Sequence, residues 1–331
     1  MTNQVNDPVN APSVPTEMNA VVLDRFGDLD ELSFRRIPVP QLGDDDVLIR
    51  VEYAGLGSWD THERADGFVI AGREPRFPYV LGWDGAGTIA AMGRNVTRFE
   101  LGDRVYAATI PALRPGFYAQ YAAVEAEHVA HIPARLSTQQ AAAMPWDALT
   151  ALIGLDVLGL QPGQRLMVFG ASGGIGHMTV QLARHAGVKV LAVVSGEDGV
   201  AWAESVGAEA VVDGRRDDVL AAVTQFAPDG LDAALVTVGG ETAERSLQAV
   251  KASGQIAWPN DVLPALGVSP AARVTYYDGD RSRVSTERLN AIVEASAFEV
   301  HVPAEFPLDR AQDAHRALRE HYVGKMVLKI S

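Results

Sequence analysis

The segment Gly170-Ala171-Ser172-Gly173-Gly174-Ile175-Gly176 has the residue types and the position of an anion-binding loop. It follows the apolar run 166–169, which is typical of a buried strand, and it precedes a segment of amphipathic helical period. Bare glycines let backbone N–H groups and the positive end of a helix approach a pyrophosphate, and the last glycine lets helix and strand pack closely. The sequence therefore predicts a dinucleotide site; an ordinary tight turn is the alternative. The predicted residues are Gly170, Ser172, Gly173, Gly174, Ile175 and Gly176.

The end of the second strand of such a fold selects the cofactor, because a carboxylate there binds the ribose hydroxyls and repels a 2′-phosphate. Here Ser195 and Gly196 occupy this end, and Arg215 follows the next strand. A hydroxyl, a bare backbone and a guanidinium favour NADP(H) over NAD(H). Glu197 and Asp198 argue against this preference, unless they serve as acidic residues at a helix N-terminus.

Two patterns of hydrophobic residues indicate the elements that position these groups. After residue 133, short apolar runs alternate with helical stretches, which predicts a doubly wound parallel sheet in an α/β fold. We expect strands at 166–169, 189–194, 210–212, 231–236, 255–258 and near Val274, and helices at 174–186, 199–206, 217–226 and 242–251. Earlier in the chain, short β-type runs at 20–23, 47–53, 87–91 and 118–124 predict a β-rich domain with few helices.

The expected organisation has four parts. Residues 1–17 have no helix or strand period, which predicts a loose segment. Residues 18–133 are expected to form the β-rich domain, and residues 134–272 the dinucleotide-binding domain of Rossmann type. Residues 273–331 are expected to return to the first domain through helices at 286–297 and 310–321 and a strand at 326–330. His315 and His321 are expected on the solvent face of the last helix, among charged neighbours.

Composition excludes several classes of function. The 331 residues are enough for about two domains, and a formal charge of −14 disfavours nucleic acid and anionic membranes as partners. The absence of cysteine excludes disulfides, thiolate metal sites and a cysteine nucleophile. None of the four lysines lies in a motif that predicts Schiff-base chemistry. With no apolar run long enough to span a membrane and no secretion signal, we expect a cytoplasmic protein.

Several motifs in a fixed order carry a family resemblance over residues 18–331. They are Ala54-Gly55-Leu56-Gly57-Ser58-Trp59-Asp60, the segment 78–87, Gly102-Asp103-Arg104-Val105-Tyr106, Leu149-Thr150-Ala151, the glycine loop, Val238-Gly239-Gly240 and Gly324-Lys325-Met326-Val327-Leu328. With these the chain resembles the medium-chain dehydrogenase/reductase superfamily, and within it the zinc-free quinone oxidoreductase (zeta-crystallin-like) branch. The resemblance implies a GroES-like catalytic domain, a homodimer, and Thr150, Val238 and Gly239 near the nicotinamide.

The resemblance also implies catalysis without metal. Zinc-containing relatives carry their three catalytic ligands at the positions of Gly57, Trp83 and Trp146, and none of these side chains can hold zinc. Asp84 and His62 lie nearby, but two ligands of mixed type make a poor catalytic site. Quinone-branch relatives often have asparagine at the position of Gly57 and tyrosine at that of Gly214, and this chain departs from both.

Without a Lewis acid, the natural hydride acceptors are quinones and α,β-unsaturated carbonyls, because conjugation spreads the developing negative charge. The resemblance places Ser58, Trp59, Trp83 and Trp146 in the substrate pocket, where indoles would favour a planar acceptor; the alternative is that they fill the space left by zinc. His62, two residues after Asp60, matches a proton-relay histidine of alcohol dehydrogenase relatives, so His62 and Asp60 are the candidate catalytic residues. A solvated helix histidine is the alternative for His62.

Two other functions stay open at this point. One is a metal-free dehydrogenase that acts on a saturated carbonyl, an alcohol or an imine. The other is a protein that binds NADPH without turnover. Activity toward saturated acceptors would indicate the first, and tight binding without hydride transfer would indicate the second.

Overall fold

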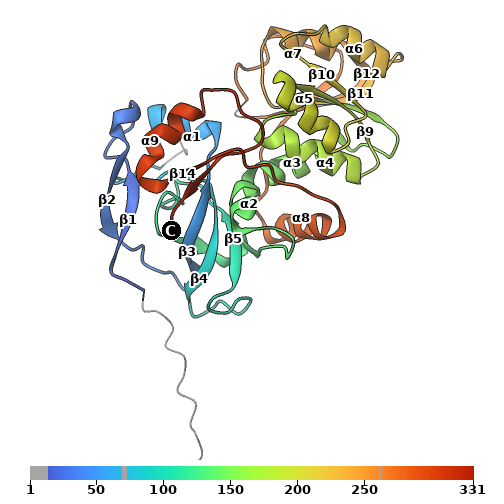
Figure 1. Ribbon diagram of the computed structural model, residues 1–331. Helices are drawn as coiled ribbons and strands as arrows, with labels where there is room; N and C mark the ends of the chain where they lie inside the picture. The colour runs from blue at the N-terminus through green and yellow to red at the C-terminus, as the bar shows by residue number, and fades with distance from the viewer. Residues whose placement is uncertain (1–13, 69–72, 261) are drawn as a thin grey trace, which may run out of the picture.

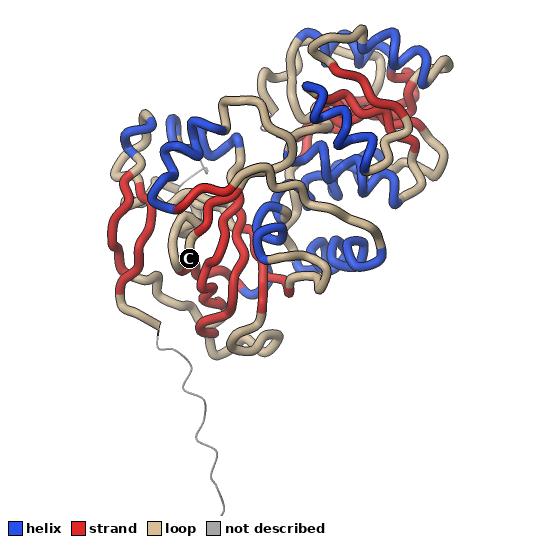
Figure 2. The backbone as a smooth tube through the Cα atoms, in the orientation of Figure 1, coloured by secondary structure: helices blue, strands red, loops and turns tan. Residues whose placement is uncertain are grey.

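The computed structural model describes residues 14–68, 73–260 and 262–331, and it contains two large sheets joined by helices (Figure 1). Residues 1–13 of the expected loose segment 1–17 lie outside the described residues, and the first strand begins at Glu17. Figure 2 shows the two groups of strands on opposite sides of the molecule, with helices around and between them.

One sheet has six parallel strands in the order β10-β9-β8-β11-β12-β13. The strands are β8 (Arg165–Phe169), β9 (Lys189–Val194), β10 (Ala210–Asp213), β11 (Leu231–Val236), β12 (Val250–Pro259) and β13 (Arg273–Tyr277). The central strands β8, β9 and β11 are largely apolar runs, as expected where helices cover both faces of a sheet, whereas β12 and β13 carry several polar residues. The connecting helices are α4 (Gly174–His185), α5 (Gly196–Ser205), α6 (Val219–Phe226) and α7 (Glu241–Ser246).

The strand order reverses between β8 and β11, so the loops that follow these neighbouring strands diverge to opposite sides of the sheet. In open parallel sheets a ligand binds at this switch point, outside the carboxyl ends of the strands. The glycine loop follows β8 and the Val238-Gly239 segment follows β11, so both lie at this point. The predicted doubly wound α/β sheet is confirmed.

The second large sheet has seven strands in the order β14-β15-β3-β4-β5-β7, with β6 also paired to β3. The strands are β3 (Asp46–Gly55), β4 (Asp84–Met92), β5 (Arg104–Ala108), β6 (Tyr121–Glu125), β7 (Val129–His131), β14 (Glu305–Pro307) and β15 (Val327–Lys329). A separate antiparallel pair consists of β1 (Glu17–Val22) and β2 (Ser33–Pro38). Sequence patterning did not identify β2, β5 and β14; the strand pattern of β2 is interrupted by two arginines, and β14 has only three residues.

Five helices lie in or beside this half of the molecule: α1 (Ser58–Asp66), α2 (Thr138–Ala143), α3 (Pro145–Leu158), α8 (Arg283–Ala295) and α9 (Ala311–Ala317). Short 3₁₀ turns cover Leu29–Glu31, Ala126–His128, Leu247–Ala249 and Leu308–Arg310. α3 is mostly apolar and largely buried. It packs against α4 and β12 and also contacts β4 and β5, so it lies between the two sheets. No helix within the described residues is long and apolar enough to cross a bilayer.

The last part of the chain crosses between the sheets. β13 completes the parallel sheet, whereas β14 and β15 pair with the seven-stranded sheet. The last helix ends at Ala317, four residues short of the expected end at residue 321. The expectation that His315 faces solvent is wrong: its side chain is 1% exposed, because α9 packs it against Tyr118 in the first half of the molecule.

Candidate functional site

A cleft of about 310 Å³ opens at the carboxyl ends of β8, β9, β10 and β11. It brings together several residues that the sequence predicted for cofactor binding: Gly170, Ser172, Ser195, Arg215, Val238 and Gly239. Val194, Gly214 and Thr242 are further lining residues. The segments that meet here are far apart in sequence, and the parallel sheet alone aligns them.

The glycine loop has a closed side and an open side. A Cβ on Gly176 would lie 2.1 Å from the carbonyl oxygen of Gly170, so the close approach of α4 to β8 requires glycine. A Cβ on Gly173 would meet only the carbonyl of Gly170 at 3.5 Å, so that side of the loop is open. Gly174 differs, because a Cβ there would lie 2.5 Å from Oδ2 of Asp147. One face of the helix N-terminus is therefore free for an anion, and the other is packed against a carboxylate.

The end of β9 carries a hydrogen-bonded arrangement that the sequence did not reveal. Nε2 of His321 lies 2.8 Å from Oδ1 of Asp198, and Nδ1 of the same ring lies 3.5 Å from Oγ of Ser195. Asp198 has a lowered pKa, chiefly through its hydrogen bond with His321. Gly196 has a φ of +79°, and a Cβ there would lie 3.0 Å from the His321 ring, so glycine permits this approach.

The other acidic residue at this end is also paired. Arg216 lies 2.8 Å from Glu197, and the exposed Arg215 has no side-chain partner in the described part of the chain. Both carboxylates that would oppose a 2′-phosphate thus have basic partners, while a guanidinium beside the cleft stays unpaired. His321 lies beyond the last helix, so no local sequence pattern could have placed it here.

A buried cluster of one lysine and two aspartates lies between the two sheets. Nζ of Lys325 contacts Oδ2 of Asp84, at the start of β4, and lies 2.9 Å from Oδ2 of Asp147, in the first turn of α3. All three side chains are at most 2% exposed. Oδ1 of Asp84 accepts the backbone N–H of Trp146 at 2.7 Å.

Burial and pairing act in opposite directions in this cluster. Burial raises the pKa of Asp84 to about 6, and Lys325 limits this rise. Burial also raises the pKa of Asp147, again opposed by Lys325. Burial alone would lower the pKa of Lys325, but Asp147 and Asp84 together outweigh this effect and raise it. The lysine is therefore charged, and its ammonium favours the ionised form of both carboxylates.

The three tryptophans surround this cluster. The rings of Trp83 and Trp146 meet edge to face, with centroids 4.8 Å apart, and the ring of Trp59 lies 4.7 Å from Nζ of Lys325. Trp83 is 4% exposed and donates its indole N–H to Glu63 at 2.6 Å, so its ring is held in a fixed position. Trp59 and Trp146 are half-buried. A Cβ on Gly57 would lie 2.1 Å from the indole of Trp59, so this ring occupies the space that a side chain at position 57 would fill.

The predicted catalytic residues occupy different environments on α1. His62 is exposed, as is Ser58. Asp60 is fully buried, and its Oδ2 accepts the N–H of Gly57 at 2.8 Å and the hydroxyl of Tyr118 at 2.9 Å. Burial is the main reason that the pKa of Asp60 rises to about 8. Its Oδ1 has no hydrogen-bond partner among the described residues, and this atom is where the proton of a neutral carboxyl would reside.

The remaining predicted residues lie near the junction of the two halves. Thr150, on α3, is buried, and its hydroxyl has no hydrogen-bond partner in the described chain. Val238 is 45% exposed at the cleft, and Gly239 donates its N–H to the carbonyl of Leu263 at 3.2 Å. Ile175 is half-buried at the start of α4. Sequence reasoning missed Lys325, Asp147 and His321, although Lys325 stands in a motif that carried the family resemblance.

The donor atoms at this site do not suit zinc. The positions that carry zinc ligands in zinc-containing relatives are Gly57, Trp83 and Trp146 here. The two carboxylates beside them already form ion pairs with Lys325. The described residues contain no group of three or more His, Asp or Glu side chains placed to hold a metal ion.

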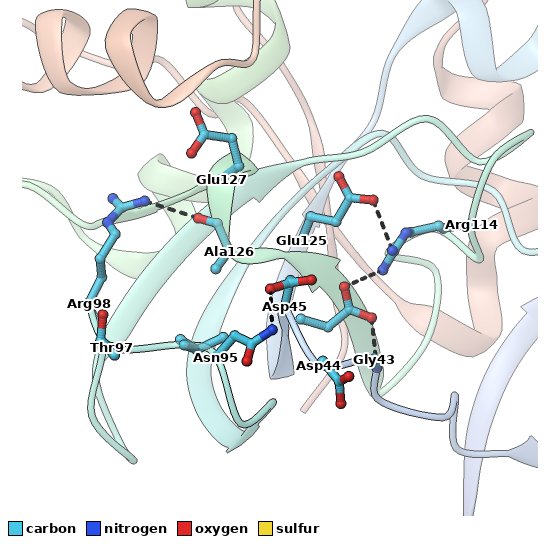
Figure 3. Close-up of a pocket in the computed structure, with 12 residues that line it drawn as sticks. Gly43, Asp44, Asp45, Asn95, Thr97, Arg98, Arg114, Glu125, Ala126 and Glu127 are labelled. Atoms are coloured by element: carbon cyan, nitrogen blue, oxygen red, sulfur yellow. Dashed lines mark hydrogen bonds and ion pairs between the residues drawn. The ribbon is translucent and has the colours of Figure 1, made fainter.

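A second cleft, of about 480 Å³, lies among the turns at the start of β3 and the end of β4 (Figure 3). In this cleft Arg114 lies 2.7 Å from Asp46 and 2.9 Å from Glu125. The amide of Asn95 donates to Asp45 at 2.9 Å. None of the predicted site residues lines this cleft.

Two protein-family models match the chain, one in each half. Residues 43–134 match the model of the alcohol dehydrogenase GroES-like domain, and residues 174–258 match that of the zinc-binding dehydrogenase family. These matches fall on the β-rich half and on the parallel sheet.

Three similar proteins cover most of the chain. Alcohol dehydrogenase 1 of Emericella nidulans is 31% identical over 78% of this chain and 79% of its own. The chloroplastic NADPH-dependent alkenal/one oxidoreductase of Arabidopsis thaliana is 29% identical over 96% of this chain and 80% of its own. The structure of the quinone oxidoreductase from Coxiella burnetii superposes with a TM-score of 0.85 at 26% identity, covering 95% of this chain and 100% of that one. The fold, the order of the motifs and these similarities show that the chain is an oxidoreductase of the medium-chain dehydrogenase/reductase superfamily, in its quinone oxidoreductase-like branch.

Proposed function

We propose that the protein is a zinc-independent, NADPH-dependent oxidoreductase that transfers hydride to a quinone or an α,β-unsaturated carbonyl. The observation that carries the proposal is the buried Lys325–Asp84–Asp147 cluster, framed by indoles where related enzymes hold a metal. A conjugated acceptor spreads its developing charge over several atoms, so it places the smallest demand on a site without a Lewis acid.

The cleft at the end of the parallel sheet supports the choice of cofactor. Its residues fit a dinucleotide, because the open face of the glycine loop and the N-terminus of α4 are suited to a pyrophosphate. Ser195, Gly196 and Arg215 would hold the 2′-phosphate, since Asp198 and Glu197 are paired with His321 and Arg216. The relative from Arabidopsis thaliana, whose name describes it as NADPH-dependent, agrees with this choice.

Reduced nicotinamide, when bound, supplies the hydride. Thr150, Val238 and Gly239 would position its ring at the junction of the two halves. Trp59 and Trp146 would present flat apolar surface to a planar acceptor, and Trp83 would support them through its contact with Trp146. His62, exposed on α1, would take a proton from water and deliver it to the reduced product, and Asp60 would orient the start of this helix through Gly57.

The decisive experiment measures the loss of NADPH absorbance with purified protein and a panel of quinones, enones, saturated ketones and imines, with NADH as the matched control. We expect oxidation of NADPH with quinones or enones, unchanged by a zinc chelator and with no zinc in the protein. Turnover confined to saturated carbonyls, alcohols or imines would support the metal-free dehydrogenase instead. Tight NADPH binding with no turnover on any acceptor would support a binding protein.

We also propose a homodimer formed through β13. This strand is one of the two outer strands of the parallel sheet in the described chain, and Tyr276 on it is 53% exposed. Nearby in sequence, Leu263 and Val268 are 56% and 45% exposed. Pairing of two such edges would extend the sheet and bury these side chains. Light scattering should give about twice the mass of 35.3 kDa. A cytoplasmic location stays a prediction from the sequence.

A further inference from the structure

The carboxylate of Asp147 lies beneath the N-terminus of the helix that follows the glycine loop. A Cβ on Gly174 would lie 2.5 Å from one oxygen of Asp147 and 2.9 Å from the other. Gly174 is the first residue of α4, so this buried negative charge lies beside the N–H groups that an anion would use. An unpaired carboxylate at this place would repel a pyrophosphate and weaken the positive end of the helix.

Lys325 supplies the opposite charge, and its position is fixed on several sides. Its ammonium lies 2.9 Å from Asp147 and also contacts Asp84. The backbone of the same turn is anchored as well, because Gly324 donates to the carbonyl of Ser172 at 2.8 Å and Lys325 to that of His301 at 3.0 Å. The last turn before β15 therefore contacts the glycine loop directly through Ser172.

We propose that Lys325 is a positioning residue for the cofactor: by neutralising Asp147 beneath Gly174, it keeps the N-terminus of α4 able to accept the pyrophosphate. The inference rests on the proposed binding of NADPH. Through Asp84, the same ammonium connects this anion site to the backbone of Trp146. Cofactor affinity then depends on the charge of a side chain in the segment between α9 and β15.

A purely structural role of Lys325 leads to a different expectation for NADPH binding. If Lys325 only stabilises the fold, removal of either partner should loosen the site, and removal of both should not recover NADPH affinity. If it neutralises Asp147, loss of the lysine should weaken NADPH binding, and a second change that removes the charge of Asp147 should restore it.

The experiment measures the dissociation constant of NADPH by titration of nicotinamide fluorescence, on full-length protein that circular dichroism shows to be folded. Lys325→Met should weaken binding about 10- to 100-fold, because a charge a few ångströms from the phosphates is left unpaired. Lys325→Met/Asp147→Asn should return to within about threefold of the wild type, and Lys325→Arg should stay near it. A double change at an ion pair of similar length on the parallel sheet, Lys251→Met/Asp232→Asn, should leave the dissociation constant unchanged.

Two results would overturn the inference: a folded Lys325→Met that binds NADPH as tightly as the wild type, or a double variant that binds as weakly as Lys325→Met. If Lys325→Met does not fold, the NADPH dissociation constant of the Asp147→Asn variant tests the inference. Neutralisation predicts binding at least as tight as in the wild type, and a tenfold loss would contradict it. Wild-type protein that binds neither NADPH nor NADH would instead refute the proposed function, so the two failures are distinguishable.

Discussion

The indole of Trp59 occupies the space that a side chain on Gly57 would need. An added Cβ would lie 2.1 to 2.6 Å from three atoms of the ring, well inside van der Waals contact. The same ring lies 4.7 Å from the ammonium of Lys325. Glycine at position 57 and tryptophan at position 59 therefore form one structural unit.

This unit predicts strong coupling between the two positions. Gly57→Ala should lower the free energy of unfolding by about 1 to 3 kcal/mol, because the added methyl group forces the indole away. In a Trp59→Ala background the same change should cost much less. Urea unfolding of the two single variants and the double variant measures the coupling, and additive losses would contradict it.

Cofactor preference should change with one residue at the end of β9. Ser195→Asp places a carboxylate where the proposed 2′-phosphate binds, so kcat/KM for NADPH should fall about 10- to 100-fold while that for NADH changes little. Ser205→Asp, at the exposed far end of α5, is the matched control. An equal loss with both cofactors would mean that Ser195 does not contact the phosphate.

The proposed proton donor can be tested on the surface of α1. His62→Ala should lower kcat about 100-fold with little change in the KM for NADPH, because protonation of the product would be lost. His185→Ala, an exposed histidine on α4, should have no effect. If turnover of the His62 variant equals that of the wild type, His62 is only a solvated helix residue.

Asp60 should make stability depend on pH. Its pKa is raised from 3.8 to about 8 in the folded protein, so the folded state binds more protons than the unfolded state between these values. The free energy of unfolding should therefore fall as pH rises through this window, by at most ~1.4 kcal/mol per unit. Asp60→Asn lacks this contribution and should gain stability relative to the wild type as pH rises. Parallel stability curves from pH 5 to 8 would contradict the raised pKa.

The sequence predicted the centre of the parallel sheet well because β8, β9 and β11 are largely apolar runs flanked by turn residues. The limits of β9 and β11 agree with expectation, and the glycine loop lies at the switch point. The end of α9 was placed too late because the Arg, Glu and His residues after Ala317 continue a helical pattern.

The pairing of charges could not be predicted from local pattern. Lys325 joins residues 241 and 178 positions earlier in the chain, and His321 reaches an aspartate 123 positions earlier. Each partner alone looks like an ordinary charged residue in its own segment. Burial decides their role, and burial is a property of the assembled halves rather than of any segment.

Lys325 comes from the segment between α9 and β15, whereas Asp84 begins β4 and Asp147 lies on α3. The three charges therefore meet only when these distant segments dock, and the same docking places β15 beside β3. Closure of this interior is for that reason a cooperative event, in which neither half of the molecule can balance its buried charge by itself.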